Sequence, residues 1–318
     1  MISSRHKARV LVAGDVMVDK FIDVEITDRA EENAPVVRMA TTLVVPGGAG
    51  RVALNVAALG ASGALTGVVG DDADGQWLRN KALPSAISTR GLMVDSERCT
   101  TAKTRIRGPA AALLRLDQEH TQLISPDLEQ RLRPLLEGQI DWAGAVVLSD
   151  YAKGALPRSL VEFAISRARA RGRPVVVDPK GSDFGRYRGC TAITPNAEEA
   201  CRAIGMTHHG NDHHSVLVAG ARLSVELPGT FVIVTRGSLG MAVFCDGAQH
   251  QTIPAVPAQE RSAIGAGDAV IAAMAVALAA GLTMQQAMEL GNRAGGVAVT
   301  KGWSEHCTIN DLVPSPAE

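Results

Sequence analysis

The chain has few cysteines, no surplus of charge of either sign and no long apolar run, and each absence excludes a class of protein. It has 5 cysteines in 318 residues. They are widely spaced and form no Cys-x-x-Cys pair, which argues against a disulfide framework and favours reduced thiols in the cytoplasm. Lys and Arg total 32 against 33 Asp and Glu, a formal net charge of −1. We therefore expect no general attraction to nucleic acid or to a membrane surface, and favour a small-molecule ligand.

No segment of the sequence is predicted to cross a membrane. The longest apolar run, residues 269–280, is shorter than the roughly 20 residues that a bilayer requires, and we interpret it as a buried helix. The basic residues at 5–9 lead into an apolar stretch, 10–13, that is too short for a signal peptide. With 46% hydrophobic and 20% charged residues, the composition is that of a globular protein. We expect one large domain over residues 1–318.

Short apolar runs alternate with helical patterns along the chain. Apolar runs bounded by Gly, Asp or Pro are typical of strands that are covered on both faces. These runs lie at residues 10–13, 65–69, 145–148, 174–177 and 231–234. Helical patterns lie between and after them at residues 51–59, 127–136, 158–171, 196–204, 268–280 and 284–300. The alternation predicts an α/β fold of three layers, a mostly parallel central sheet with helices on both faces.

Two segments, residues 18–45 and 101–116, interrupt this alternation. They are polar, alternating stretches without helical periodicity, so we expect small antiparallel strands outside the parallel sheet. We interpret them as a lid over the carboxyl edge of the sheet, where open α/β sheets bind ligands. The second segment carries a basic cluster that includes Lys103 and Arg105. Charges of this kind commonly only solvate an edge strand.

The sequence Gly265-Ala266-Gly267-Asp268 opens the apolar helix. Glycines just before a helix leave its first N–H groups approachable, and these amides together with the helix dipole favour a phosphate or a developing oxyanion. Asp268 could be a plain helix-start carboxylate. Beside phosphate-binding amides it could instead take a proton from an attacking hydroxyl. The stretch lacks the G-x-G-x-x-G pattern, which disfavours a nicotinamide-dependent dehydrogenase.

A second glycine-rich turn, residues 46–50, precedes Arg51 and Asn55. Such turns also serve simple chain reversal. The charge of Arg51 opposes the dipole at a helix start. An anionic ligand at this position would explain the arginine, and a solvated side chain is the open alternative. Earlier in the chain, Asp15 and Asp19 follow the first strand and could hydrogen-bond neighbouring sugar hydroxyls.

Two further patterns could hold a metal ion. Asn196 and Glu199 stand at the start of a predicted helix, where a capping box is the structural interpretation. The alternative is that they share a hydrated Mg²⁺, which takes one or two oxygen ligands from protein and the rest from phosphate and water. The histidine-rich residues 208–214 resemble a metal tract, but without a neighbouring Cys or carboxylate pattern we favour a polar loop.

Three loops follow predicted strands and could contact phosphate. Lys153 and Lys180 could neutralise phosphoryl charge or be ordinary solvated loop lysines. The Gly/Ser turn at residues 235–240 suits backbone contact with phosphate or ribose.

Taken together, these motifs resemble the ribokinase-like (PfkB) carbohydrate kinases over nearly the whole chain. The matching motifs are Gly14-Asp15, Gly47-Gly48, residues 196–199, residues 235–237 and residues 265–268. Within that family, further runs look like the D-glycero-D-manno-heptose 7-phosphate kinases of lipopolysaccharide precursor synthesis. These runs are residues 14–19, 148–155, 178–189 and 258–260. In some bacteria this kinase is fused to an adenylyltransferase domain, and the kinase pattern here implies a stand-alone kinase.

The resemblance implies a ribokinase-like sandwich with a small lid, and a role for each matched residue. Asp268 would be the base for the anomeric hydroxyl, with the phosphoryl group held by the amides of Gly265, Ala266 and Gly267. The residues implied for the sugar phosphate are Asp15, Gly47, Gly48, Asp150 and Lys153. Arg51 and Asn55, from the second glycine-rich turn, are our own further candidates for the same substrate. Lys103 and Arg105 are our candidates for the 7-phosphate.

The resemblance also implies ATP and Mg²⁺ as cofactors. The residues implied for ATP are Lys180, Asn196, Thr235, Gly237, Gly240 and Asn292. Mg²⁺ is implied at Asn196 and Glu199. In this family the lid often pairs with a second subunit, so a homodimer through the lid is expected.

The chain departs from the family pattern at three positions. Arg51 stands where the family motif Gly-Gly-x-x-Asn has its asparagine, and a guanidinium there supports a phosphorylated sugar. Ser262 and Ile264 replace an aspartate and a hydroxyl residue of the catalytic motif. Our leading hypothesis is an ATP-dependent kinase that converts heptose 7-phosphate to the 1,7-bisphosphate. The alternatives are a kinase for another sugar, phosphosugar or nucleoside, and a non-catalytic sugar or nucleotide sensor.

Overall fold

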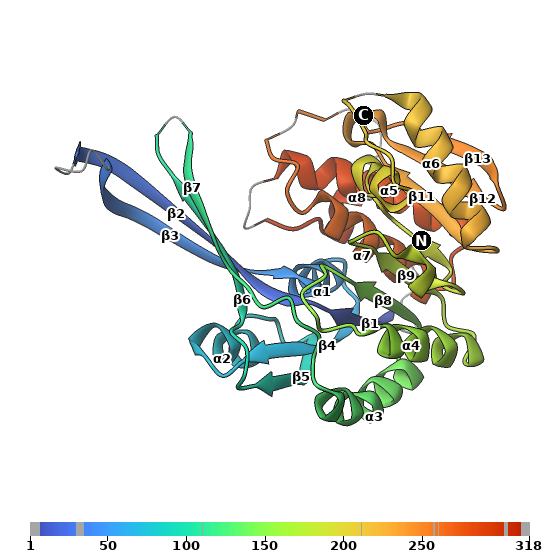
Figure 1. Ribbon diagram of the computed structural model, residues 1–318, viewed down its shortest axis with the longest axis horizontal. Coiled ribbons are helices and arrows are strands. Elements are labelled where there is room, and N and C mark those ends of the chain that lie inside the picture. The colour runs from blue at the N-terminus through green and yellow to red at the C-terminus, as the bar shows by residue number, and fades with distance from the viewer. Residues whose placement is uncertain are drawn as a thin grey trace.

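The structure is a computed structural model that describes residues 7–29, 35–109, 111–210, 212–256, 258–259, 261–301 and 305–312. Residues 5–6, 30–34, 110, 211 and 260, which belong to runs discussed above, lie outside the described residues. The described strands form a nine-stranded sheet, ordered β13-β12-β11-β10-β9-β8-β1-β4-β5, and a four-stranded sheet, ordered β3-β2-β6-β7. The smaller sheet extends away from the main body (Figure 1).

The large sheet is parallel from β5 to β11 and antiparallel at its other end. Its strands are β1 (Arg9–Gly14), β4 (Ser62–Gly70), β5 (Ile87–Asp95), β8 (Ala145–Ser149), β9 (Val175–Asp178), β10 (Ala192–Ile193), β11 (Phe231–Thr235), β12 (Met241–Cys245) and β13 (Ala248–Ile253). The five strands predicted from apolar runs are confirmed as β1, β4, β8, β9 and β11. The prediction of a mostly parallel central sheet is therefore confirmed.

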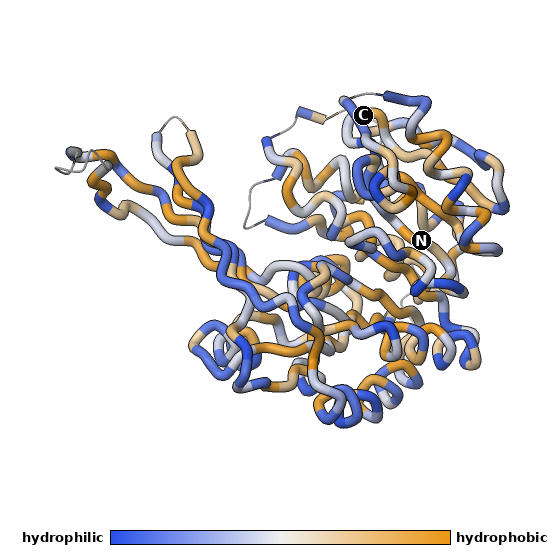
Figure 2. The backbone as a smooth tube through the Cα atoms, in the orientation of Figure 1, coloured by the Kyte–Doolittle hydropathy of each residue, from blue (hydrophilic) through white to orange (hydrophobic). Residues whose placement is uncertain are grey.

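Successive residues of β1 point to opposite faces of the large sheet. Val10 and Val12 join a core that is covered by α1 (Ala49–Ala58), α7 (Ala266–Ala279) and α8 (Met284–Thr300). Leu11 and Ala13 join a second core on the other face. That core is covered by α3 (Pro126–Trp142), α4 (Arg158–Ala170), α5 (Ala197–Ala203) and α6 (His213–Glu226). Because a strand alternates its side chains, an apolar run that is buried on both faces yields three layers. Figure 2 shows hydrophobic segments, in orange, along the strands and helices of the main body.

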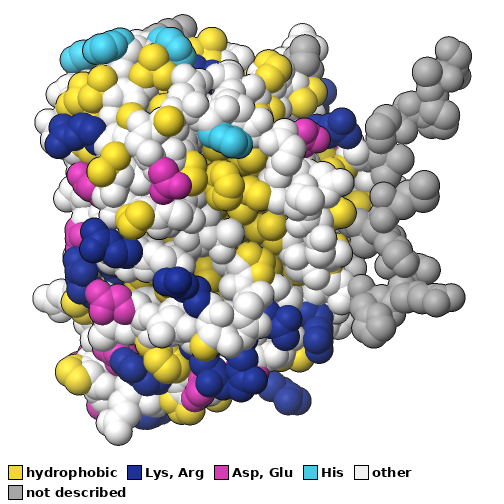
Figure 3. All heavy atoms as spheres, turned by 90° about the vertical axis from the view of Figure 1, so that its right-hand side faces the viewer, with side chains coloured by type: hydrophobic (Ala, Val, Ile, Leu, Met, Phe, Trp, Pro, Cys, Tyr) yellow, Lys and Arg dark blue, Asp and Glu magenta, His cyan; other side chains and the backbone are white. Residues whose placement is uncertain are grey.

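Shorter elements complete the described chain. They are α2 (Ala73–Asn80), α9 (Ile309–Leu312) and the 3₁₀ helices η1 (Phe184–Tyr187) and η2 (Gly237–Leu239). Within the described ranges, we find no helix with the length and apolar character needed to span a membrane. On the face drawn in Figure 3, basic and acidic side chains are intermixed.

The small sheet consists of two antiparallel hairpins. One hairpin pairs β2 (Val16–Arg29) with β3 (Pro35–Gly48), and the other pairs β6 (Thr101–Arg107) with β7 (Ala112–Gln118). The prediction of antiparallel strands is right for each hairpin, but β2 and β6 pair in parallel. Both strands continue from parallel strands of the large sheet, β1 and β5, so they leave its carboxyl edge in the same direction. We call this four-stranded sheet the lid.

Candidate active site

The Gly265–Asp268 motif forms the N-terminal tip of α7. Gly265 is the N-cap, with a left-handed φ of 84°, and Asp268 lies in the first turn. Gly267 is exposed, and a Cβ placed on it would have no atom within 4 Å. The first N–H groups of a helix have no intrahelical acceptor, although the Ala266 amide donates to the Ala263 carbonyl at 3.3 Å. The tip is thus open to an anion mainly on the Gly267 side.

Asp268 is buried beneath this open tip, with 7% of its surface exposed. Its Oδ1 accepts a hydrogen bond of 2.9 Å from the hydroxyl of Tyr151. Burial raises the pKa of Asp268 to about 6, while the charge of Arg51 and the Tyr151 hydrogen bond act in the opposite direction. At neutral pH the carboxyl is ionised yet more basic than an ordinary aspartate, which suits a general base.

Arg51 brings a fixed positive charge to the same place. A Cβ placed on Gly265 would lie 3.0 Å from the Arg51 Nη1 atom, so the missing side chain lets the guanidinium pack against the α7 tip. Its Nη2 lies 4.0 Å from Oδ2 of Asp19. Arg51 is only 4% exposed, so the alternative of a solvated arginine is wrong. The unfavourable helix-start position is offset by the carboxylates of Asp19 and Asp268.

Asp19 faces this region from strand β2. Its Oδ1 accepts a hydrogen bond of 2.6 Å from Arg105 on the neighbouring strand β6. A Cβ on Gly47 would lie 2.4 Å from Oδ2 of Asp19, so only glycine allows the carboxylate this approach. Gly48 caps α1 with a φ of 53°. Asn55 turns back on its own helix, where its Nδ2 donates to the Arg51 carbonyl at 3.2 Å.

Asp15, the other member of the early aspartate pair, is occupied by backbone amides. Its Oδ2 accepts from the N–H groups of Tyr151, at 2.7 Å, and Lys153, at 3.0 Å. Its Oδ1 accepts from the N–H of Ala155 at 3.0 Å. Burial raises the pKa of Asp15 against these hydrogen bonds. The Asp15 carboxylate therefore orders the loop between β8 and α4, and Asp19 is the better placed candidate for binding a ligand.

Asp150, at the end of β8, is occupied in a similar way. It accepts from the N–H of Ala152 at 2.9 Å and from the hydroxyl of Tyr187 at 2.8 Å. The Arg186 guanidinium lies 3.4 Å from the same carboxylate. With 2% exposure, Asp150 is directed into the protein and holds η1 against β8.

A basic cluster lies where the lid meets the β8–α4 loop. Lys153 forms an ion pair of 2.8 Å with Glu119, which follows β7. Lys103 lies 3.9 Å from both Asp117 and Glu119. Desolvation and the nearby charges of Arg115 and Lys153 lower the pKa of Lys103. The structure thus brings together the lysines that the sequence placed on the lid and on a strand end, with Glu119 between them.

The start of α5 resolves one alternative left open by the sequence. Asn196 Oδ1 accepts from the Glu199 N–H, and Glu199 Oε2 accepts from the Asn196 N–H, each at 2.9 Å. The capping box is therefore present. Lys180 donates to the other oxygen of Glu199. Nearby, burial raises the pKa of Asp178 to about 8 against the charge of Lys180.

The side-chain oxygens of Asn196 and Glu199 are better suited to bind the waters of a hydrated Mg²⁺ than to coordinate the ion directly. Both oxygens of Glu199 already accept hydrogen bonds, and Lys180 adds a positive charge where an inner-sphere ion would lie. No group of three or more metal-ligating side chains is found in the described ranges. Carboxylate and amide oxygens can still hydrogen-bond the waters of an ion that phosphates hold, and Mg²⁺ keeps several waters.

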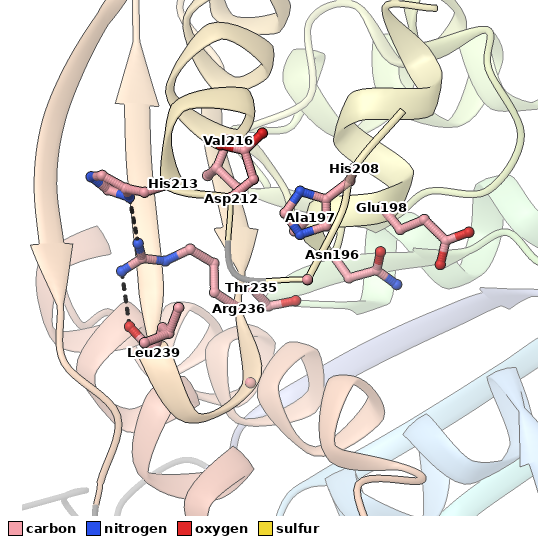
Figure 4. Close-up of a pocket in the computed structure, with 12 residues that line it drawn as sticks. Asn196, Ala197, Glu198, His208, Asp212, His213, Val216, Thr235, Arg236 and Leu239 are labelled. Carbon is pink, nitrogen blue, oxygen red and sulfur yellow. Dashed lines mark hydrogen bonds between the residues drawn. The ribbon is translucent and has the colours of Figure 1, made fainter. Parts of the chain in front are cut away.

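A pocket of about 230 Å³ opens beside the capping box (Figure 4). It is lined by Asn196, Thr235 and Gly237, and by His208, His213 and Arg236. Nη1 of Arg236 lies 3.1 Å from Nδ1 of His213; since a guanidinium can only donate, this nitrogen accepts.

The histidine run at the edge of this pocket is only partly a loop. His213 and His214 form the first turn of α6. The Asp212 carboxylate caps this helix by accepting from the N–H groups of His214 and Ser215. The prediction of a polar loop therefore holds for residues 208–210 and for Asp212, and is wrong for His213 and His214.

Gly240 and Asn292, which were predicted to bind ATP, do not line this pocket. Gly240 has a φ of 76°, and a Cβ there would lie 2.1 Å from the Ile253 carbonyl oxygen, so the turn requires glycine. Asn292 on α8 donates from Nδ2 to the Pro254 carbonyl at 2.8 Å.

Sequence reasoning missed three residues that shape the site, namely Tyr151, Asp178 and Glu119. Tyr151 and Asp178 stand at or just after the ends of β8 and β9, and this position at the carboxyl edge is the signal that could have found them. Glu119 had no local signal, because its role depends on lysines from two distant segments.

Comparisons with known proteins agree with this geometry. The model of the pfkB family carbohydrate kinases matches residues 7–310. The chain is 38% identical over 303 residues to the bifunctional protein HldE of Desulfatibacillum aliphaticivorans, covering 94% of this chain and 61% of that protein. It is 40% identical over 306 residues to the HldE protein of Caulobacter vibrioides, covering 95% and 62%. The chain thus spans about three fifths of the length of these relatives.

A solved structure shows the same fold. Arabidopsis thaliana ribokinase, solved with ribose and ATP, superposes with a TM-score of 0.71 at 19% identity, covering 96% of each chain. The ribokinase-like fold predicted from the sequence is therefore confirmed. With a family match over nearly its whole length, this chain belongs to the pfkB family of carbohydrate kinases and is a sugar kinase.

Proposed function

We propose that the protein transfers the γ-phosphoryl group of ATP to the anomeric hydroxyl of D-glycero-β-D-manno-heptose 7-phosphate. The product would be the 1,7-bisphosphate, a precursor of ADP-heptose and of the lipopolysaccharide inner core. The observation that carries the proposal is the α7 tip, where an open glycine amide, a buried carboxylate of raised pKa and a buried arginine meet. The similarity to HldE proteins supports the heptose as acceptor.

Asp268 is the general base in this proposal. Its carboxylate accepts the proton of the anomeric hydroxyl as the sugar oxygen bonds to phosphorus and the bond to ADP breaks. The amide at Gly267 and the guanidinium of Arg51 face the charge that develops on the phosphoryl oxygens. Both groups are fixed in advance by backbone and packing, so little reorganisation is needed at the moment of transfer.

The sugar phosphate would lie between α1 and the lid. Asp19 would hydrogen-bond the ring hydroxyls of the sugar. Gly47 and Gly48, which have no side chains, would let the sugar come close to the backbone. The 7-phosphate would lie against Lys103, Arg105 and Lys153, exchanging their present ion pairs with Asp19, Asp117 and Glu119 for phosphate oxygens. Arg51, at the reacting end, adds charge to the same substrate.

The nucleotide would lie along the carboxyl ends of β9 to β11. The pocket lined by Asn196, Thr235 and Gly237 supports this placement, with Gly240 and Asn292 on the adjoining loop and helix. Lys180 would neutralise phosphate charge after exchanging its bond to Glu199. Mg²⁺, held by the phosphates and through water by Asn196 and Glu199, would supply further charge neutralisation.

We also propose that the protein is a homodimer joined through its lid. Large apolar side chains are exposed on the lid strands, with Met39 63%, Leu116 52%, Leu114 51% and Ile26 51% exposed. Contiguous apolar exposure of this kind commonly marks an interface.

All five cysteines are free thiols, in keeping with a cytoplasmic enzyme.

ADP release measured with and without heptose 7-phosphate, with the mass of the product recorded, tests the proposed reaction. We expect ADP formation that depends on the acceptor and a product heavier by one phosphoryl group. ADP formation with a different sugar, phosphosugar or nucleoside in an acceptor panel would reject the heptose and keep the kinase. Calorimetric binding of ATP without turnover of any acceptor would point to a sensor.

A further inference from the structure

We infer that Tyr151 is a positioning residue that orients Asp268 and keeps it ionised for proton transfer. The inference rests on the proposed role of Asp268 as the base. It starts from one contact: the hydroxyl of Tyr151 donates to Oδ1 of Asp268 at 2.9 Å. The two residues are far apart in sequence and come from different elements, so this bond joins the β8–α4 loop to the tip of α7.

The backbone of Tyr151 is fixed from below by Asp15. The Tyr151 N–H donates to Oδ2 of Asp15 at 2.7 Å, and the same carboxylate binds the amides of Lys153 and Ala155. The main chain of Asp15 is itself tied on both sides: its N–H donates to Ser149 and its carbonyl accepts from Ala49, each at 3.0 Å. The loop that carries Tyr151 is therefore anchored to β8 and α1.

The ring of Tyr151 is also held on its face. The ammonium of Lys180 lies 5.4 Å from the ring centroid, a cation–π distance. Lys180 is bonded in turn to Glu199 of the α5 capping box. The ring thus stands between the proposed phosphate region of the nucleotide and the proposed base, and its orientation is set by both.

Toward the Asp268 carboxylate the hydroxyl of Tyr151 is the donor. Burial and the nearby charge of Asp268 raise the pKa of Tyr151 well above its ordinary value, so the phenol keeps its proton at any working pH. A donor bonded to a carboxylate favours the charged form. The bond occupies Oδ1, so the acceptor hydroxyl is expected at Oδ2. During transfer the proton moves from the sugar hydroxyl to Oδ2, and Tyr151 gives up no proton.

The variant Tyr151→Phe removes the hydroxyl and keeps the ring beside Lys180. We expect kcat to fall about tenfold, the KM values for ATP and sugar to change by less than about threefold, and the acidic limb of kcat/KM to move to higher pH by about half a unit or more. The shift is upward because the lost hydrogen bond lowers the pKa of Asp268.

Tyr187→Phe is the matched control. The Tyr187 hydroxyl also donates to a buried aspartate, Asp150, at 2.8 Å, but it does not contact α7. We expect its acidic limb to stay in place even if its melting temperature falls. An equal shift in both variants, or no shift in Tyr151→Phe, would overturn the inference.

A second measurement is independent of the acceptor sugar. The pKa of the Asp268 carboxyl can be read by ¹³C NMR of protein labelled at aspartate carboxyls, with the signal assigned from Asp268→Asn. We expect a higher pKa in Tyr151→Phe than in the wild type. If the pKa rises but no sugar phosphate is turned over, the proposed function fails and the positioning contact stands. An unchanged pKa would refute the contact itself.

Discussion

The two sheets of this protein differ in how their strands are covered. All five residues of β8 and all four of β9 are buried between helical layers, whereas all seven residues of β7 in the lid are exposed. The large sheet completes its own core, and the lid leaves apolar side chains on its surface. The large sheet is therefore a rigid support for the site, whereas the lid needs a ligand or another protein surface to cover its apolar side chains.

The proposed chemistry is divided between the same two regions. The base and the open helix tip belong to α7, which packs on the large sheet. The groups proposed for the distant phosphate belong to the lid and its base. We expect changes on the large sheet to act mainly on turnover and changes on the lid to act mainly on substrate affinity and assembly.

The largest effect is expected from Asp268→Asn. The amide keeps the shape of the side chain but cannot accept the proton, so kcat should fall by roughly 10²–10⁴ with little change in KM. Steady-state ADP release measures both. Asp127→Asn, at an exposed carboxylate in the first turn of α3, is the matched control and should keep full activity. Near-normal turnover in Asp268→Asn would mean that another group is the base.

Arg51→Ala tests the arginine that lies between the α7 tip and Asp19 on lid strand β2. Removing the guanidinium should lower kcat, because Arg51 faces the charge that develops on the phosphoryl oxygens, and should raise the KM for the phosphorylated sugar by about tenfold or more and the KM for ATP much less. Arg51→Lys, which keeps a charge in the buried position, should recover part of the loss. Initial rates with each substrate varied in turn provide the measurement. Equal increases for both substrates would dismiss a role for Arg51 toward the sugar.

The double variant Leu114→Glu with Leu116→Glu tests whether the lid joins two copies of the chain. Two charges on the exposed face of β7 should weaken a lid-to-lid dimer by about tenfold or more, seen as a lower molar mass in light scattering after size exclusion. Leu135→Glu, at an exposed leucine of α3 on the main body, is the control and should leave the mass unchanged. A wild-type protein that is monomeric at all concentrations would reject the dimer.

The smallest effect is expected from Asp178→Asn in the large sheet. Burial raises the pKa of Asp178 to about 8, so the folded state favours the protonated acid. That contribution to stability is present below the ordinary pKa of aspartate and is lost as pH rises through about 8. The asparagine variant cannot ionise, so its stability relative to the wild type should increase as pH rises from the ordinary pKa of aspartate through about 8.

Thermal unfolding across the pH range measures this gain. Asp127→Asn, at an exposed carboxylate, is the control and should show no comparable gain in stability. A constant difference for Asp178→Asn would contradict the raised pKa.

The sequence predicted best what depends on local burial. The apolar strands at residues 10–13 and 145–148 and the α7 run were found because an uninterrupted apolar stretch must be covered on all sides. The helices α2 and α6 were missed because α2 is polar, with two buried residues, and α6 opens on a histidine run. The parallel pairing of β2 with β6 depends on contacts between distant segments and has no local pattern.

Within the site, the glycines and Asp268 were predictable because they form a contiguous motif. The roles of Asp15 and Asp150 were not, because a carboxylate that binds loop amides and one that binds a ligand have the same sequence signal. Asp19 was recognised as a possible partner of Asp15, but only the folded loop decides which of the two is occupied.

The short junction between β1 and β2 has a mechanical consequence. A single residue, Asp15, separates the end of β1 at Gly14 from the start of β2 at Val16, and its carboxylate is pinned by amides of another loop. The lid therefore has no free hinge at this junction, and β2 is fixed at the end that joins β1. Opening or closing of this hairpin would have to come from bending of the long strands β2 and β3 farther out, which would leave the residues beside the reacting centre in place.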